Sequence, residues 1–209
     1  LRLQTVVCSI QSGVWTLANS PYVLNTVVTV PVDETLVIEP GVVIEARSGG
    51  ASLIVTGSLV AQGTVDSPIT LQGIPQTANP FHSHGGNLTF NAGSSGNLKH
   101  FIVDRMGYND RTAIVVNSSG VTIDSSQVSD SDRTGLSIPV NVSPTITNSD
   151  FSNNAVDLYA HPGSVSNVIG NTECLIILSQ GTITADAAMH PQNNAGADFF
   201  LERNTTVAA

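Results

Sequence analysis

The sequence predicts an all-β chain folded as a parallel β-solenoid, and three observations lead to this prediction. Short β-branched runs alternate with tight turns, as in TVPVDETLVIEPGVVIEA from Thr29, where Glu39-Pro40-Gly41 separates two runs. A unit of about 22 residues recurs in the second half of the chain, which is typical of repeat folds. The composition of 41% hydrophobic and only 11% charged residues, with 18 glycines, is unlike that of a helical cytosolic enzyme.

The second half contains the clearest repeats, which begin at Ala113, Gly135 and Val156. Each repeat consists of a short apolar strand, a turn, a second strand and a polar Ser/Asn/Asp stretch. The best local match is between NDRT, ending at Thr112, and SDRT, ending at Thr134. Alternation of apolar residues predicts that one face of each strand is buried. The residues predicted to face the core are Ile114, Val116, Val121, Ile123, Leu136, Ile138 and Ile146.

The first half follows the same pattern less regularly. Its predicted core pairs are Leu36 and Ile38, Val42 and Ile44, Leu53 and Val55, Leu59 and Ala61, and Ile69 and Leu71. Turns are predicted at residues 39–41 and at Gly57, and Glu39 and Glu45 are expected to point to water. Strands of three to five residues with such short corners can pair in parallel with the equivalent strand one coil later. Polar corners such as TNSDFSNNA, from Thr147, are expected to stack as side-chain ladders.

An immunoglobulin-like sandwich is the alternative fold, because several short strands separated by frequent turns also fit that architecture. Sandwich strands do not repeat in register, so the recurrence of about 22 residues argues against it. The solenoid is expected to have about eight coils and to form a single domain over residues 1–209.

Several stretches resemble a known superfamily. The elements Trp15-Thr16, Ser20-Pro21-Tyr22, TLVIEPGVVI, GSLVAQGT and DSPIT look like the opening coils of right-handed parallel β-helix proteins of the bacterial cell surface. The TITNSDFSNN coils are similar to the pectate-lyase-type β-helix repeat. The resemblance covers about residues 13–180 and implies a right-handed parallel β-helix, but the repeat is shared by lyases, hydrolases, adhesins and structural proteins.

Two segments and the two ends depart from the repeat. Residues 73–86 contain prolines and glycines and predict an irregular loop that bulges from a corner. Residues 186–209 form a non-repeat tail, in which Phe199, Phe200 and Leu201 predict a last strand or a cover for the end. LRLQTVVCSI at the start predicts a strand, and neither end contains a cap helix. We therefore expect either a module from a longer chain or ends that meet other copies head to tail.

Charge and hydropathy exclude some classes of partner. Acidic residues outnumber basic ones by 16 to 7, and Lys99 is the only lysine, so nucleic acid is not an expected partner. No apolar run approaches the ~18 residues that span a bilayer, so no membrane span is expected. The chain begins at Leu1 without Met, as a processed product would, and we expect an extracellular or cell-surface location.

Two Asp-Arg pairs are candidate ligand-binding residues. Asp110-Arg111 and Asp132-Arg133 lie one predicted coil apart and are expected to stack. In the pectate-lyase-like enzymes that the repeat resembles, stacked carboxylates hold Ca²⁺ against an acidic sugar and a basic residue abstracts the proton. The resemblance would assign that basic role to Arg111 or Arg133. The alternative is a solvated ladder of ion pairs, and no catalytic residue is assigned.

The two cysteines are far apart in the predicted solenoid. Cys8 is expected in the first coil and Cys174 near the last, roughly 30 Å away at ~4.8 Å per coil. A disulfide needs Cα atoms within ~7 Å, so these residues cannot pair within one copy. They are either two unrelated buried thiols or a head-to-tail disulfide between neighbouring subunits.

Two function classes remain for this sequence. His82 and His84 could begin a metal site with His100, but no carboxylate or cysteine lies close enough in sequence to complete it, so we expect no cofactor apart from Ca²⁺ in the lyase alternative. The favoured class is a non-enzymatic extracellular structural module that associates end to end. The alternative is a carbohydrate-active β-helix, either a polysaccharide lyase or an acidic-sugar-binding domain.

Overall fold

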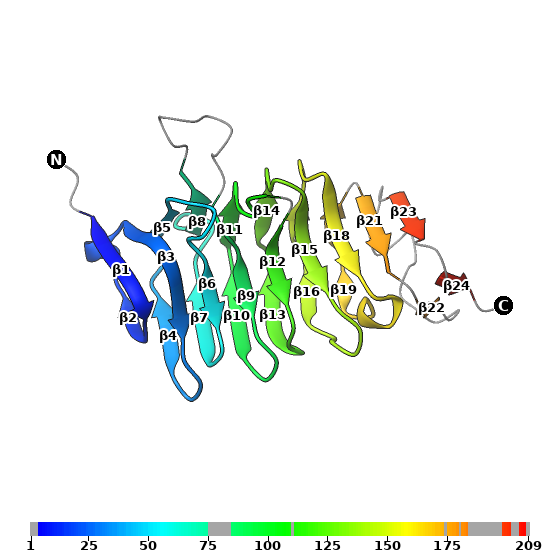
Figure 1. Cartoon of the computed structure of the whole chain (residues 1–209), viewed down its shortest axis with the longest axis horizontal. Coiled ribbons are helices and arrows are strands. Elements are labelled where there is room, and N and C mark those ends of the chain that lie inside the picture. The colour runs from blue at the N-terminus through cyan, green and yellow to red at the C-terminus, as the bar shows by residue number, and fades with distance from the viewer. Residues whose placement is uncertain are drawn as a thin grey trace.

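The computed structural model describes residues 4–74, 85–109, 111–173, 175–179, 181–183, 198–201 and 205–207. Figure 1 shows these residues as coils stacked side by side along the long axis, with the two termini at opposite ends. Every strand pair is parallel, and each strand lies beside its equivalent in the next coil. The chain is therefore a parallel β-helix, as the sequence predicts, and the antiparallel sandwich is excluded.

The coils have three faces. Face 1 contains β5 (Val43–Ala46), β8 (Ile69–Gly73), β11 (Phe101–Asp104), β14 (Gln127–Ser129), β17 (Asp150–Phe151) and β20 (Thr172–Glu173). Face 2 contains β6 (Leu53–Val55), β9 (Leu88–Phe90), β12 (Thr112–Val116), β15 (Thr134–Ile138), β18 (Val156–Ala160), β21 (Leu175–Leu178) and β23 (Asp198–Leu201). Face 3 contains β2 (Gly13–Trp15), β4 (Thr35–Ile38), β7 (Ser58–Gln62), β10 (Ser95–Lys99), β13 (Gly120–Asp124), β16 (Thr145–Thr147) and β19 (Val168–Ile169).

The remaining elements lie at the two ends. The long strand β3 (Tyr22–Val30) joins faces 1 and 2 into one 15-stranded sheet, and β1 (Thr5–Ile10) pairs along it. Near the C-terminus β22 (Gly181–Ile183) pairs with β24 (Thr205–Val207). The helices of the described chain are two short 3₁₀ turns, η1 (Leu17–Asn19) and η2 (Pro162–Ser164). No helix in this part of the protein is long and apolar enough to cross a membrane.

The register confirms the predicted repeat. Thr112 pairs with Thr134, which are the final residues of NDRT and SDRT. On the same face Ile114 pairs with Leu136, and Leu136 pairs with Leu158. The period of 22 residues is thus the length of one coil. Face 3 receives a strand from each of seven coils, and face 2 continues through β21 and β23, in agreement with about eight coils.

All the predicted core residues are buried, with at most 2% of each side chain exposed. They stack in like-on-like rows inside the three faces, where each aliphatic side chain contributes about 1.5–3 kcal/mol by burial. The predicted turn at residues 39–41 is also present, and Gly41 has a positive φ of 80° that favours glycine. Strands this short are stable because each is paired along the stack.

One expectation about this segment was wrong. Glu45 points outward from β5, but only 6% of it is exposed. Arg47 Nη2 lies 3.4 Å from Glu45 Oε2, and Gln4 Nε2 donates to the same oxygen at 3.5 Å. These neighbours, from the next turn and from the N-terminal segment, cover the carboxylate. Glu39 is half-buried and accepts a hydrogen bond from the backbone N–H of Leu17.

An aromatic pair fills the core of the first coil. The rings of Trp15 and Tyr22 stack with centroids 4.6 Å apart and an interplanar angle of 8°. Tyr22 Oη accepts from the backbone N–H of Thr16 at 2.7 Å, and Trp15 Nε1 donates to Gln11 Oε1 at 3.4 Å. Both rings are at least 96% buried. This pair therefore gives the first coil a packed aromatic core.

The structure describes only parts of the two segments that were predicted to depart from the repeat. β8 includes Gly73 and β9 begins at Leu88, so the first residue of the predicted loop, residues 73–86, belongs to a strand. Residues 75–84 lie outside the described part of the chain. Within the predicted tail, β23 pairs in parallel with β21, so a further strand is present there.

Candidate functional site

The corner between face 3 and face 1 is unusually tight and is repeated in successive coils. Its first residue has a positive φ in four consecutive coils, at His100 (44°), Ser125 (49°), Asn148 (52°) and Gly170 (70°). Most residues avoid this left-handed conformation, whereas Gly adopts it freely and Asn and His are enriched in it. Only one or two residues separate the strands of face 3 from those of face 1 at this corner in these coils.

A buried ladder follows each of these residues. The backbone N–H of Ser126 donates to Ser149 Oγ at 3.1 Å, and that of Ser149 donates to Asn171 Oδ1 at 2.9 Å. The Ser126 and Ser149 hydroxyls and the Asn171 amide donate in turn to backbone carbonyls at 2.9–3.0 Å. This is the stacked polar corner that TNSDFSNNA predicts. Because its buried groups are satisfied, the ladder holds the corner rigid.

Asp124, on face 3 beside this corner, is held by four groups from three coils. Its Oδ1 accepts from Thr147 Oγ1 and Asn148 Nδ2, both at 2.9 Å. Its Oδ2 accepts from Ser125 Oγ at 3.1 Å and lies 3.3 Å from Lys99 Nζ. These hydrogen bonds, that of Asn148 above all, lower the pKa of Asp124 to about 2. A carboxylate so fully occupied stabilises the stack and is not a candidate catalytic group.

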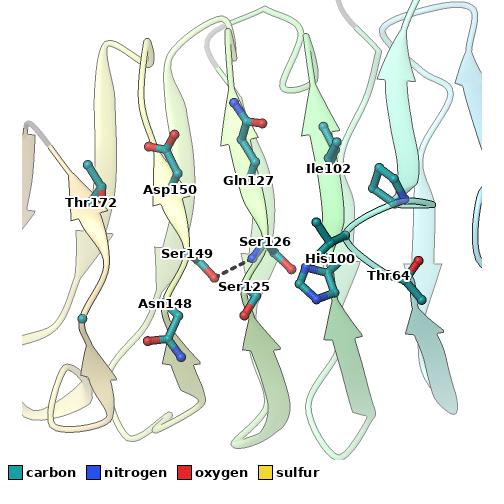
Figure 2. Close-up of a pocket in the computed structure, with 13 residues that line it drawn as sticks. Thr64, His100, Ile102, Ser125, Ser126, Gln127, Asn148, Ser149, Asp150 and Thr172 are labelled. Carbon is teal, nitrogen blue, oxygen red and sulfur yellow. Dashed lines mark hydrogen bonds between the residues drawn. The ribbon is translucent and has the colours of Figure 1, made fainter.

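A shallow groove of about 370 Å³ runs along the outside of this corner (Figure 2). One wall is the row Ile102, Gln127, Asp150 and Thr172, one residue per coil in register on face 1. The opposite wall is the row of positive-φ residues. At one end the longer corner of residues 63–68 contributes Thr64, Val65 and Pro68. The groove is therefore built from side chains repeated at the coil spacing, ~4.8 Å.

The polar side chains in the face 1 wall of the groove lack hydrogen-bond partners in the described part of the protein. In the described structure Gln127, Thr172 and the imidazole of His100 make no side-chain hydrogen bond, and Asp150 Oδ1 is buried without a partner. The adjacent inner ladder is, by contrast, fully hydrogen-bonded. No lysine or arginine is among the described residues that line the groove. The groove can thus accept hydrogen bonds from a ligand and donate them to it, but its described lining offers no lysine or arginine to an anionic group.

The predicted Asp-Arg site is only partly assembled. Because Thr112 pairs with Thr134, Arg111 and Arg133 occupy equivalent positions one coil apart, and both are exposed. Neither guanidinium forms an ion pair within the described residues. Asp132 is exposed, and Asp110 lies outside the described residues. The neighbouring Asp104 is instead paired with Arg105 at 2.7 Å.

Of the predicted cysteine and histidine sites, the structure describes only Cys8 and His100. Cys8 lies on β1 in the first coil, as predicted, but it is exposed and free, so the expectation of a buried thiol is wrong for this residue. Cys174, His82 and His84 lie outside the described residues. Within the described ranges no three His, Cys, Asp or Glu residues are grouped so that they could hold a metal ion.

Sequence reasoning missed the groove. The polar stretches were interpreted as corner ladders, which accounts for Ser126, Ser149 and Asn171. The available signal was that Gln127, Asp150 and Thr172 follow these ladder residues directly and therefore point outward on one face. The fold and this surface define a parallel β-helix with a polar groove along one corner. No protein-family model, curated protein or solved structure matches the chain.

Proposed function

We propose that this chain is a non-enzymatic structural module of an extracellular or cell-surface assembly, in which copies associate end to end. The observation that carries the proposal is the free edge of the first coil. Among the described strands, β1 pairs only with β3 and β2 pairs only with β4. Edge strands with free N–H and C=O groups are templates for pairing with another chain.

Apolar side chains accompany this free edge. Val6 and Ile10 on β1 are 61% and 67% exposed, and Val14 on β2 is 56% exposed. Val14 begins an outward row with Val37 and Val60, which are half-buried because a coil flanks each of them on both sides. A further coil against β1 and β2 would cover Val14 in the same way. Such a coil would therefore bury apolar surface and also pair with the free backbone groups of β1 and β2.

A second copy of this chain is the occupant that fits the edge. Head-to-tail stacking keeps the strand direction parallel across the junction, and β23 at the far end is parallel to β21. The contact is heterologous, so it continues into a filament rather than closing into a dimer. The resemblance of the opening coils to bacterial surface β-helices and the low content of charged residues support an extracellular setting.

Substitution of the exposed edge tests the proposal. The double variant Val6→Lys with Ile10→Lys places charges on β1 at side chains that are exposed, so the fold of the single copy is preserved. Val65→Lys is the matched control, since Val65 is 79% exposed in the middle of the stack. Light scattering across a concentration series should detect large assemblies of the native and control proteins and monomers of the double variant. Monomers of the native protein at all concentrations would refute the proposal.

The lyase alternative has weaker support. Arg111 and Arg133 are stacked and accessible, as a basic residue acting on an acidic sugar would need to be. However, the described carboxylates do not form a group that could hold Ca²⁺ beside them. Calcium-dependent degradation of polygalacturonate by dispersed monomers, abolished in Arg111→Ala or Arg133→Ala, would favour the lyase over the structural module.

A further inference from the structure

We infer that the groove along the corner between faces 3 and 1 is a binding site for a neutral, hydroxyl-rich chain, namely a short segment of an uncharged polysaccharide. This site lies on the side of the stack and is independent of the end-to-end contact. The inference rests on the groove's unsatisfied polar row, its apolar end and its lack of cations.

The polar row supplies repeated hydrogen-bonding groups. Gln127, Asp150 and Thr172 lie in register on adjacent coils, at a spacing of ~4.8 Å, so the row extends roughly 10 Å along the stack. The amide both donates and accepts, as does the hydroxyl, whereas the carboxylate accepts only. A ligand for this row must therefore present both donors and acceptors at intervals of about one coil, as a chain of hydroxyl-bearing rings does.

Asp150 is the most specific feature of the row. Its Oδ1 is buried and has no hydrogen-bond partner among the described residues. Leaving a buried acceptor without a hydrogen bond lowers the stability of a protein. The fold does not require this carboxylate, because the adjacent Ser126, Ser149 and Asn171 already satisfy the corner. Oδ1 itself is enclosed by protein, but Asp150 as a whole is half-buried and lines the groove, so a ligand hydroxyl can donate to the accessible part of its carboxylate.

The other end of the groove is apolar. Val65, Pro68 and Ile102 line it, and Val65 is the most exposed large aliphatic side chain among the described residues. Figure 2 shows Ile102 and the imidazole of His100 beside the corner that holds Thr64. A ligand that extends from the polar row to this end must be polar at its edges and have C–H surface on its faces. Sugar rings combine these two properties, and pockets that hold such ligands typically combine apolar and polar walls.

Charge selects against an acidic sugar. The described residues that line the groove include neither lysine nor arginine, Asp150 contributes a carboxylate, and the formal net charge of the chain is −9. An anionic chain would meet repulsion here without a compensating cation. The ligand class for this groove is therefore neutral, in contrast to the acidic sugar that the sequence suggested for Arg111 and Arg133.

Titration calorimetry with defined tetrasaccharides tests the inference. The probes are β-1,4-glucan, β-1,3-glucan, β-1,4-mannan and α-1,4-glucan tetrasaccharides, with tetragalacturonate as the acidic counterpart. The protein is the full chain carrying Val6→Lys and Ile10→Lys, so that association at the ends does not affect the result. We expect at least one neutral probe to bind and tetragalacturonate to bind at least about tenfold more weakly.

Variants of the row locate the binding. Gln127→Ala and Asp150→Asn each remove or alter one hydrogen-bonding group and should weaken binding about 3- to 10-fold. Thr70→Ala is the matched control, because Thr70 lies in the same outward row but outside the groove, and it should bind like the parent. Thermal unfolding by circular dichroism verifies that each variant is folded.

Three results would overturn the inference. The first is that none of the neutral probes binds. The second is that tetragalacturonate binds as tightly as the best neutral probe. The third is that Gln127→Ala and Asp150→Asn leave the affinity unchanged, which would place the ligand elsewhere. Each result leaves the end-to-end proposal standing, because that proposal is tested by assembly and not by sugar binding.

Discussion

Asp124 is expected to make the stability of the β-helix depend on pH, and the structure defines the size of the effect. Asp124→Asn removes the charge while keeping the shape of the side chain. The four hydrogen-bonding partners lower the pKa of Asp124 from 3.8 to about 2, and one pKa unit corresponds to about 1.4 kcal/mol. The full shift would be worth roughly 2.4 kcal/mol. Because 24% of the side chain is exposed, solvent screening reduces this to about 1–2 kcal/mol.

The sign of the pH dependence follows from the direction of the shift. A carboxylate whose pKa is lowered by folding contributes its stability above the unfolded value of 3.8, and that contribution is lost as pH falls through about 2. The native protein should therefore exceed Asp124→Asn in free energy of unfolding by about 1–2 kcal/mol at neutral pH. The difference should shrink between pH 4 and pH 2 and vanish below pH 2.

Urea unfolding followed by far-UV circular dichroism, repeated from pH 7 to pH 2, measures this difference. Asp66→Asn is the matched control, because Asp66 is exposed and its carboxylate makes no hydrogen bond within the described residues. The control should have the same free energy of unfolding as the native protein at pH 7. A gap between native protein and Asp124→Asn that stays constant from pH 7 to pH 2 would refute the reasoning.

Three further substitutions test the interior of the stack by the same unfolding measurement. Ser149→Ala removes the acceptor for the backbone N–H of Ser126 and should lower the free energy of unfolding by about 1–3 kcal/mol. Thr122→Ala, at an exposed position, is the control and should lower it by almost nothing. Equal effects of the two substitutions would contradict a structural role for the ladder. Gly107→Ala should destabilise the protein more than Gly93→Ala. Both glycines have φ near 80°, but a Cβ would meet the carbonyl oxygen of Arg111 at 2.6 Å only at Gly107. A reversed order of stability would contradict the packing around Gly107. Leu136→Ala should cost about 2–5 kcal/mol because it opens a cavity within a fully buried row, and a loss below 1 kcal/mol would contradict its core position.

The core and the repeat were predictable because they depend on properties that recur along the chain. Ile114 and Val116 occupy alternate positions of one strand, as Leu136 and Ile138 do in the next coil, and the 22 residues between Ile114 and Leu136 are the length of one coil. The buried corner ladder was equally accessible, since Ser and Asn at equivalent positions can satisfy one another only when coils stack. In these cases local sequence and long-range contact follow the same period.

The groove and the exceptions at the N-terminal end could not be predicted in this way. The groove is formed where the longer corner of residues 63–68 lies beside the row of Ile102, Gln127, Asp150 and Thr172. The row follows the period of the coils, but the longer corner does not. Glu45 is buried because Gln4 and Arg47 cover it, and neither residue belongs to the repeat. Cys8 is exposed because it follows the buried Val7 on β1 and therefore points outward, although free cysteines are usually buried. The groove and the covering of Glu45 depend on contacts that are not repeated from coil to coil in the described residues.

The central proposal, end-to-end association of β-helix modules, is tested most directly by electron microscopy of the purified protein. A stack of about eight coils at ~4.8 Å per coil predicts filaments with an axial repeat of about 40 Å. The double variant Val6→Lys with Ile10→Lys should form none under the same conditions. Dispersed single particles of the native protein would contradict the account, as would filaments of the double variant.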